Sequence, residues 1–120
     1  MDNLTDIELM ELVAIAVGGE ISLGHSKKRT GPTWEEWEWI GPVGYCKNGI
    51  CRKPLISDGD AFRLAVELKI DQIFSPLDVF VFAPDVRAIA VDYDGDELAK
   101  TRRAIVMAAA SIGKLKKDIQ

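Results

Sequence analysis

The stretch LDVFVFAPDVRAIAVDYDGDELAK, residues 77–100, contains two segments of alternating side chains, a turn signal and the start of a helix. Residues 79–82 alternate between valine and phenylalanine, which is the two-residue period of a β-strand. Pro84-Asp85 is typical of a tight turn, and the alternation resumes in residues 88–92. The stretch therefore predicts two neighbouring strands followed by a helix.

Two segments nearer the N-terminus carry the spacing and end signals of amphipathic helices. In the first, Thr5 and Glu8 form a capping-box pattern, and Gly18 follows the last apolar turn. The second, LISDGDAFRLAVELKI, begins at Ser57 or Asp58. The expected inward faces are Ile7, Met10, Ala14 and Val17 with Leu9, Val13 and Ala16 in the first helix, and Ala61, Leu64, Ala65 and Leu68 in the second.

A third helix is expected from about Asp96 to Ile112. Leu98, Ile105 and Ile112 recur every seven residues along it. Gly113 then follows, and the basic residues after it suit the negative end of the helix dipole. We therefore expect the helix to end at Gly113.

The middle of the chain predicts a loop, a strand and a hairpin. GHSKKRTGPT, residues 24–33, has no apolar period and is expected to form a polar loop. WEEWEWIG, residues 34–41, alternates like a strand with one solvated side. Asn48-Gly49 favours a two-residue hairpin turn, which would place Cys46 opposite Cys51.

These elements predict one domain over residues 1–120. Helices at both ends and in the middle, around short, mostly antiparallel strands, indicate an α+β fold, an alpha-beta-alpha sandwich with three helices. The composition is 48% hydrophobic, which suffices for a core, and no apolar run reaches the length of a membrane span. The N-terminus lacks a signal-peptide pattern, so a cytoplasmic location is expected.

The acidic cluster of Asp92, Asp94, Asp96 and Glu97 has two interpretations. Its oxygens could bind Ca²⁺ or Mg²⁺, although the EF-hand pattern fails here. The favoured interpretation is helix capping, because Asp96 and Glu97 would lie in the first turn, where negative charge is stabilising. The DGD tripeptide also recurs at residues 58–60, again at a helix start, so no cofactor is expected.

The cysteines and the single histidine offer little reactive chemistry. Cys46 and Cys51 could form a cross-strand disulfide or half of a zinc site, but a zinc site usually has four Cys or His ligands and only His25 could join the two cysteines. Free thiols on a sheet face are therefore expected in a reducing cytoplasm. No nucleophile lies in a convincing position beside His25.

Aromatic residues give the candidate partner-binding site. Trp34, Trp37 and Trp39, with Tyr45 nearby, either belong to the core or anchor a protein partner. The glutamates within residues 35–38 would repel nucleic-acid phosphates.

Nucleic-acid binding would depend on Lys27, Lys28 and Arg29, with a second basic patch at residues 114–117. It would require the two patches to converge in space. The formal net charge of -4 argues against it.

Two stretches, KPLISDGDAFRLAVELKI (53–70) and KTRRAIVMAAASIGK (100–114), resemble the phage ABA-sandwich domain family, whose function is unknown. The matching elements are Leu4-Thr5-Asp6 with Glu8, the Trp37 and Trp39 strand, Pro54 to Leu68, and Arg103-Ala104 onward. The resemblance implies a phage accessory protein that acts inside an infected bacterium, and it supplies no catalytic residues.

Three functions follow as hypotheses. The first is a non-enzymatic accessory protein that binds a host or phage protein and inhibits host defence, in the manner of an anti-CRISPR. The second is a small metal-dependent or nucleotide-binding enzyme that uses residues 92–97. The third is nucleic-acid binding, and homodimerisation through an exposed edge strand is compatible with each.

Overall fold

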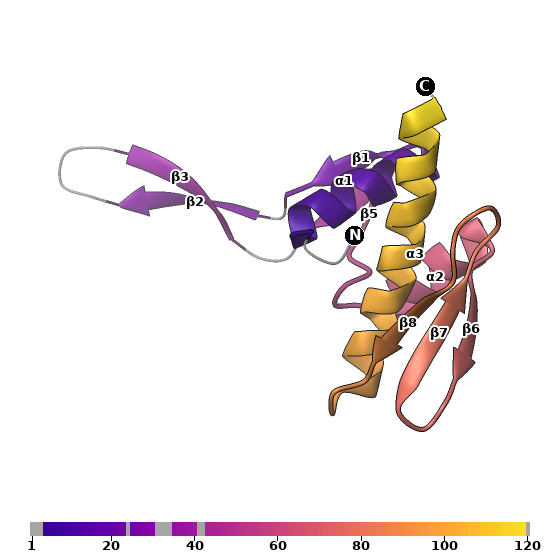
Figure 1. Cartoon of the computed structure of the whole chain (residues 1–120). Helices are drawn as coiled ribbons and strands as arrows, with labels where there is room; N and C mark the ends of the chain where they lie inside the picture. Colours follow the sequence, from indigo (N-terminus) through magenta and orange to yellow (C-terminus); the bar gives the residue numbers. More distant parts are fainter. Residues whose placement is uncertain (1–3, 24, 31–34, 41–42, 120) are drawn as a thin grey trace.

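The computed structural model describes residues 4–23, 25–30, 35–40 and 43–119, and it describes residues 25–30 and 35–40 by their backbone. The predicted α+β class is confirmed: three helices accompany two small antiparallel three-stranded sheets and a separate pair of strands. Figure 1 shows the long C-terminal helix lying between the other elements of the body.

Helix α1 (Asp6–Val17) begins and ends as its sequence predicts. The Thr5 hydroxyl accepts a hydrogen bond from the Glu8 backbone N–H, and the Glu8 carboxylate accepts one from the Thr5 backbone N–H. The Thr5 backbone N–H and the Thr5 hydroxyl both donate to the Glu8 carboxylate, and these two bonds lower the pKa of Glu8 below its usual value of 4.5. Gly18 ends the helix in the left-handed conformation. The predicted inward face is confirmed except for Ile7, which is 45% exposed.

The first sheet has the strand order β1 (Glu20–Ser22), β4 (Gly44–Lys47) and β5 (Ile50–Arg52). Asn48 and Gly49 both have positive φ in the predicted turn between β4 and β5. Cys46 lies directly opposite Cys51, as expected, but the predicted free thiols are wrong because the two form a disulfide. The prediction gave the reducing compartment more weight than the disulfide alternative, whereas the β4–β5 ladder pairs the two cysteines directly.

Strands β2 (His25–Thr30) and β3 (Glu35–Ile40) form a hairpin that projects from the body of the molecule (Figure 1). The strand predicted around residues 34–41 is confirmed for β3. The polar loop predicted for residues 24–33 is wrong over β2. Pairing with β3 supplies backbone hydrogen bonds, so a segment without its own apolar period becomes a strand.

Helix α2 (Asp58–Leu68) has Ser57 as its N-cap, because the Ser57 hydroxyl accepts a bond from the Asp60 backbone N–H. Its predicted inward face is confirmed, with Ala61, Leu64 and Ala65 buried and Leu68 packed against the core.

The second sheet has the order β6 (Asp71–Phe74), β7 (Asp78–Phe82) and β8 (Ile89–Asp92). The two predicted strands are β7 and β8, and the turn at Pro84-Asp85 is confirmed. Strand β6 was not predicted. It is short, and Ile73 and Phe74 are adjacent apolar residues that break the two-residue period expected of a half-buried strand.

Helix α3 (Glu97–Ile119) is longer than predicted, since it continues past Gly113 instead of ending there. It contacts α1, α2 and the β6–β8 sheet, while α1 in turn contacts β1 and β4. The helices thus lie between the two three-stranded sheets in a layered, sandwich-like domain. Because α3 is covered on several sides, most of its buried residues are small: Ala104, Ala108, Ala109, Ala110 and Gly113.

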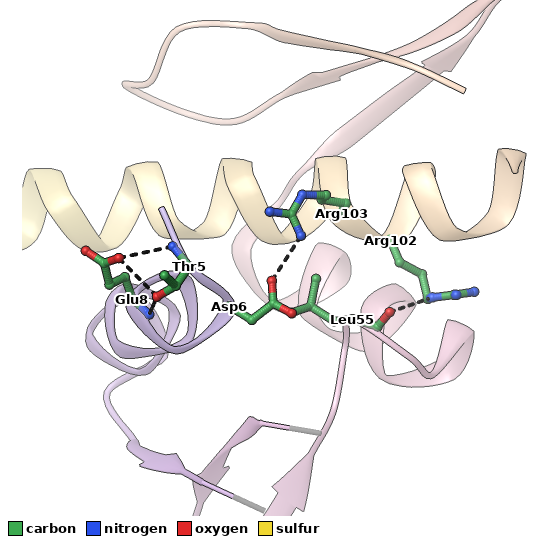
Figure 2. A network of polar contacts seen from close by, with 6 residues as sticks. All are labelled: Thr5, Asp6, Glu8, Leu55, Arg102 and Arg103. Atoms are coloured by element: carbon green, nitrogen blue, oxygen red, sulfur yellow. Dashed lines mark hydrogen bonds and ion pairs between the residues drawn. The ribbon is translucent and has the colours of Figure 1, made fainter. Parts of the chain in front are cut away.

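Adjacent arginines of α3 hold the starts of the two other helices. Arg102 donates to the Leu55 carbonyl oxygen at 3.0 Å and to the Asp58 carboxylate at 2.6 Å. Arg103 donates to the Asp6 carboxylate at 3.1 Å. Figure 2 shows Arg102 reaching Leu55 and Arg103 reaching Asp6 from neighbouring positions on α3. The Arg102 side chain is 19% exposed and that of Arg103 is 38% exposed.

We expect the substitution Arg102→Ala to lower the free energy of unfolding by about 2 kcal/mol, because it removes two charge-assisted hydrogen bonds, a part-buried one to the Leu55 carbonyl oxygen and an exposed one to the Asp58 carboxylate. The matched substitution Arg103→Ala removes a more exposed ion pair and should cost about 0.5 kcal/mol. Urea denaturation of both variants measures the difference. Equal losses would contradict the unequal roles assigned to the two arginines.

Candidate functional site

The face of the β6–β8 sheet turned away from the core carries several exposed apolar side chains on neighbouring strands. Val79 and Val81 point toward α3 and are fully buried, so the alternate residues of β7 point away from it. We call the outward positions of the three strands the outer face. They are Asp71 and Ile73 in β6, Asp78, Phe80 and Phe82 in β7, and Ala90 and Asp92 in β8.

The apolar residues of the outer face form a row across the sheet. Ile73 is paired with Phe80, and Phe80 is paired with Ala90, so the three are direct neighbours on adjacent strands. Ile73 is 56% exposed, Phe80 36% and Phe82 38%. The apolar surface of these neighbouring side chains is removed from water only when another molecule covers them.

Aspartates lie on both sides of this row. Asp71 is paired with Phe82 on one side, and Asp78 is paired with Asp92 on the other. The Asp78 carboxylate accepts a hydrogen bond from the Ser75 hydroxyl, and the Asp92 carboxylate accepts one from the Asp94 backbone N–H. Because an ionised carboxylate has two acceptor oxygens, these local bonds orient the carboxylates without using their full capacity.

The acidic cluster at residues 92–97 serves the start of α3. The Asp96 carboxylate accepts the Ala99 backbone N–H at 3.0 Å, which is the bond of an N-cap residue. The capping interpretation is therefore confirmed for Asp96, and Asp94 has a positive φ in the turn before it. Among the described residues, no three carboxylate, histidine or cysteine side chains are grouped so that they could hold a metal ion.

The predicted aromatic site is only partly described. Trp34 lies outside the described residues, and Trp37 and Trp39 lie on β3 of the projecting hairpin, opposite Lys28 and Ser26. Tyr45 is 2% exposed in the core, and burial raises the pKa of its hydroxyl above 10.0. Tyr45 belongs to the hydrophobic core cluster, so its side chain is not on the surface where the prediction placed a partner contact.

The two basic patches lie apart. Lys27, Lys28 and Arg29 belong to the hairpin, which extends away from the body, whereas residues 114–117 are near the C-terminal end of α3 (Figure 1). The Lys116 ammonium group also donates to the Ala16 carbonyl oxygen at 2.7 Å, at the end of α1. The convergence that nucleic-acid binding would need is therefore not met.

Comparisons with known proteins leave the family open. No protein-family model matches the chain, and the searches of curated proteins and of solved structures found no match either. The resemblance to the phage ABA-sandwich family stays a prediction from the sequence. In the described part of the chain, no helix combines the length and the apolar content needed to cross a membrane.

Sequence reasoning missed the outer face, although a signal for it was present. The alternation in residues 79–82 places bulky apolar side chains on both sides of β7, valines on one and phenylalanines on the other. A strand of this kind predicts that each side has something to cover it. In the described structure only the valine side is covered, by α3.

Proposed function

We propose that this chain is a non-enzymatic accessory protein that acts by binding another protein through the outer face of the β6–β8 sheet. One observation carries the proposal: Ile73, Phe80 and Ala90 form a contiguous exposed apolar row, extended by Phe82. Scattered apolar residues are normal on protein surfaces, but grouped ones rimmed by polar residues are typical of interaction sites.

The identity of the partner follows from the family resemblance. A phage accessory protein in the cytoplasm of an infected bacterium would bind a host or a phage protein, and inhibition of a host defence complex is the proposed outcome. Such inhibition requires surface recognition rather than chemistry. The hairpin that carries Trp37 and Trp39 is the competing binding surface, and the experiment below separates the two.

The test compares proteins retained from bacterial lysate by the wild-type chain and by the variants Phe80→Ser, Trp37→Ala and Phe62→Ser. Phe62 lies on α2 and is 65% exposed, so it is a matched control for the loss of an exposed phenylalanine. We expect the wild type, Phe62→Ser and Trp37→Ala to retain the same partner protein in similar amounts. Phe80→Ser should retain at least tenfold less of it, which is the effect typical of losing an aromatic residue at the centre of an interface. Equal retention by Phe80→Ser would refute this surface.

A further inference from the structure

We infer that the outer face binds a basic amphipathic helix of the partner protein. This inference rests on the proposed function. The apolar stripe of that helix would lie along the row Ile73–Phe80–Ala90, and Lys or Arg residues on both sides of the stripe would meet Asp71 and the Asp78–Asp92 pair.

The dimensions of the row favour a single helix. Across the three neighbouring strands, the two ends of the row, Ile73 and Ala90, lie roughly 10 Å apart. This distance corresponds to about two turns of a helix lying along the row and is also close to the diameter of one helix. A standard interface between folded proteins buries about 800 Å² on each partner, far more than this row offers. A helix set into an apolar row is an established mode of recognition, with anchors at every third or fourth residue.

The charges specify the flanks of that helix. Asp71 lies two residues from Ile73 along β6, and Asp92 lies two residues from Ala90 along β8, so each is about 7 Å from the row. The outward positions of the three strands hold no Lys or Arg. Lys69, before β6, and Arg87, in the turn before β8, lie outside the paired positions. Cationic flanks on the partner would therefore find acceptors on both sides of the row.

The same charges disfavour the other occupants. Two copies of this chain joined face to face would bring Asp71, Asp78 and Asp92 of each copy together, and like charges across an interface are destabilising. Nucleic acids and anionic membranes would meet the same repulsion. A basic segment of a protein is therefore the candidate ligand whose charge complements the outer face.

A displayed library of helical peptides with randomised surface positions, selected against the full chain, tests the inference. We expect enriched peptides that combine an apolar stripe with Lys or Arg on both flanks. Their Kd should rise about tenfold with Asp71→Asn and Asp92→Asn combined, with a weaker salt dependence, and at least tenfold with Phe80→Ser. Asparagine keeps an acceptor oxygen for the Asp94 backbone N–H, and Phe62→Ser should leave Kd unchanged.

Each remaining outcome overturns a defined statement. Enriched helices that are neutral or acidic, and that still lose affinity with Phe80→Ser, would overturn the basic partner and leave the proposed binding surface intact. Enriched helices whose binding is insensitive to Phe80→Ser, or no enrichment, would overturn the outer face as a helix-docking surface. The thermal unfolding midpoint of each variant is measured alongside, so that a loss of affinity is assigned only to folded protein.

Discussion

Replacing Gly113 by alanine is expected to destabilise the protein by about 3 kcal/mol or more, although alanine is normally the better helix former by about 1 kcal/mol. A Cβ atom at Gly113 would overlap the backbone carbonyl of Leu12 in α1. That obstacle is main chain, which no change of rotamer can move. Either α1 must shift away from α3 or the helix must bend, and both changes lose buried contacts.

Gly59 provides the matched control, because it is also a glycine within a helix. A Cβ at Gly59 would meet only the Ser57 hydroxyl oxygen, at 3.9 Å, which is ordinary contact. Gly59→Ala should therefore leave stability unchanged or raise it by up to about 1 kcal/mol. Chemical denaturation of the two variants is the measurement. If Gly113→Ala were as stable as the wild type, the close approach of α1 and α3 would be incorrect.

The second large effect separates the two sides of β7. Val79→Asp should cost about 4 kcal/mol or more and leave little folded protein, because Val79 is fully buried between the sheet and α3, where a carboxylate has no partner. Phe80→Asp, one residue further, should cost about 1 to 2 kcal/mol, since Phe80 is already 36% exposed and loses mainly its cross-strand neighbours.

Circular dichroism and thermal unfolding of these two variants provide the measurement. Phe80→Asp should keep the helical signal of the wild type and a cooperative transition, whereas Val79→Asp should lose both. If Phe80→Asp also failed to fold, the outer face would belong to the core, and the binding surface proposed on it would lose its basis.

The strength of the local signals explains which elements were predictable. The capping box of Thr5 and Glu8, the Ser57 cap and the alternation in residues 79–82 each lie within a few residues of the backbone groups that they satisfy. Strand β2 and strand β6 have no such signal. Each becomes a strand because it forms backbone hydrogen bonds with the strand that follows it, β3 or β7, and its own residues carry no period that announces this pairing.

The candidate site was less predictable than the fold. The tryptophans were conspicuous in the sequence, but Tyr45, chosen with them, is part of the core. The acidic cluster was correctly interpreted as capping at Asp96, since an N-cap is again a local feature. The outer face was overlooked because exposure depends on what packs against a sheet, and the alternation of residues cannot tell a covered side from an open one.

By itself, the sequence determined where helices begin, where tight turns form and which side chains share a side of a strand, because these depend on interactions between near neighbours. The tertiary structure alone decided that α3 continues through Gly113 and that the phenylalanine side of β7 is left open. The physical reason is that each of these depends on which distant segment arrives beside the residue. Leu12 lies against Gly113, and α3 covers Val79 but leaves Phe80 exposed.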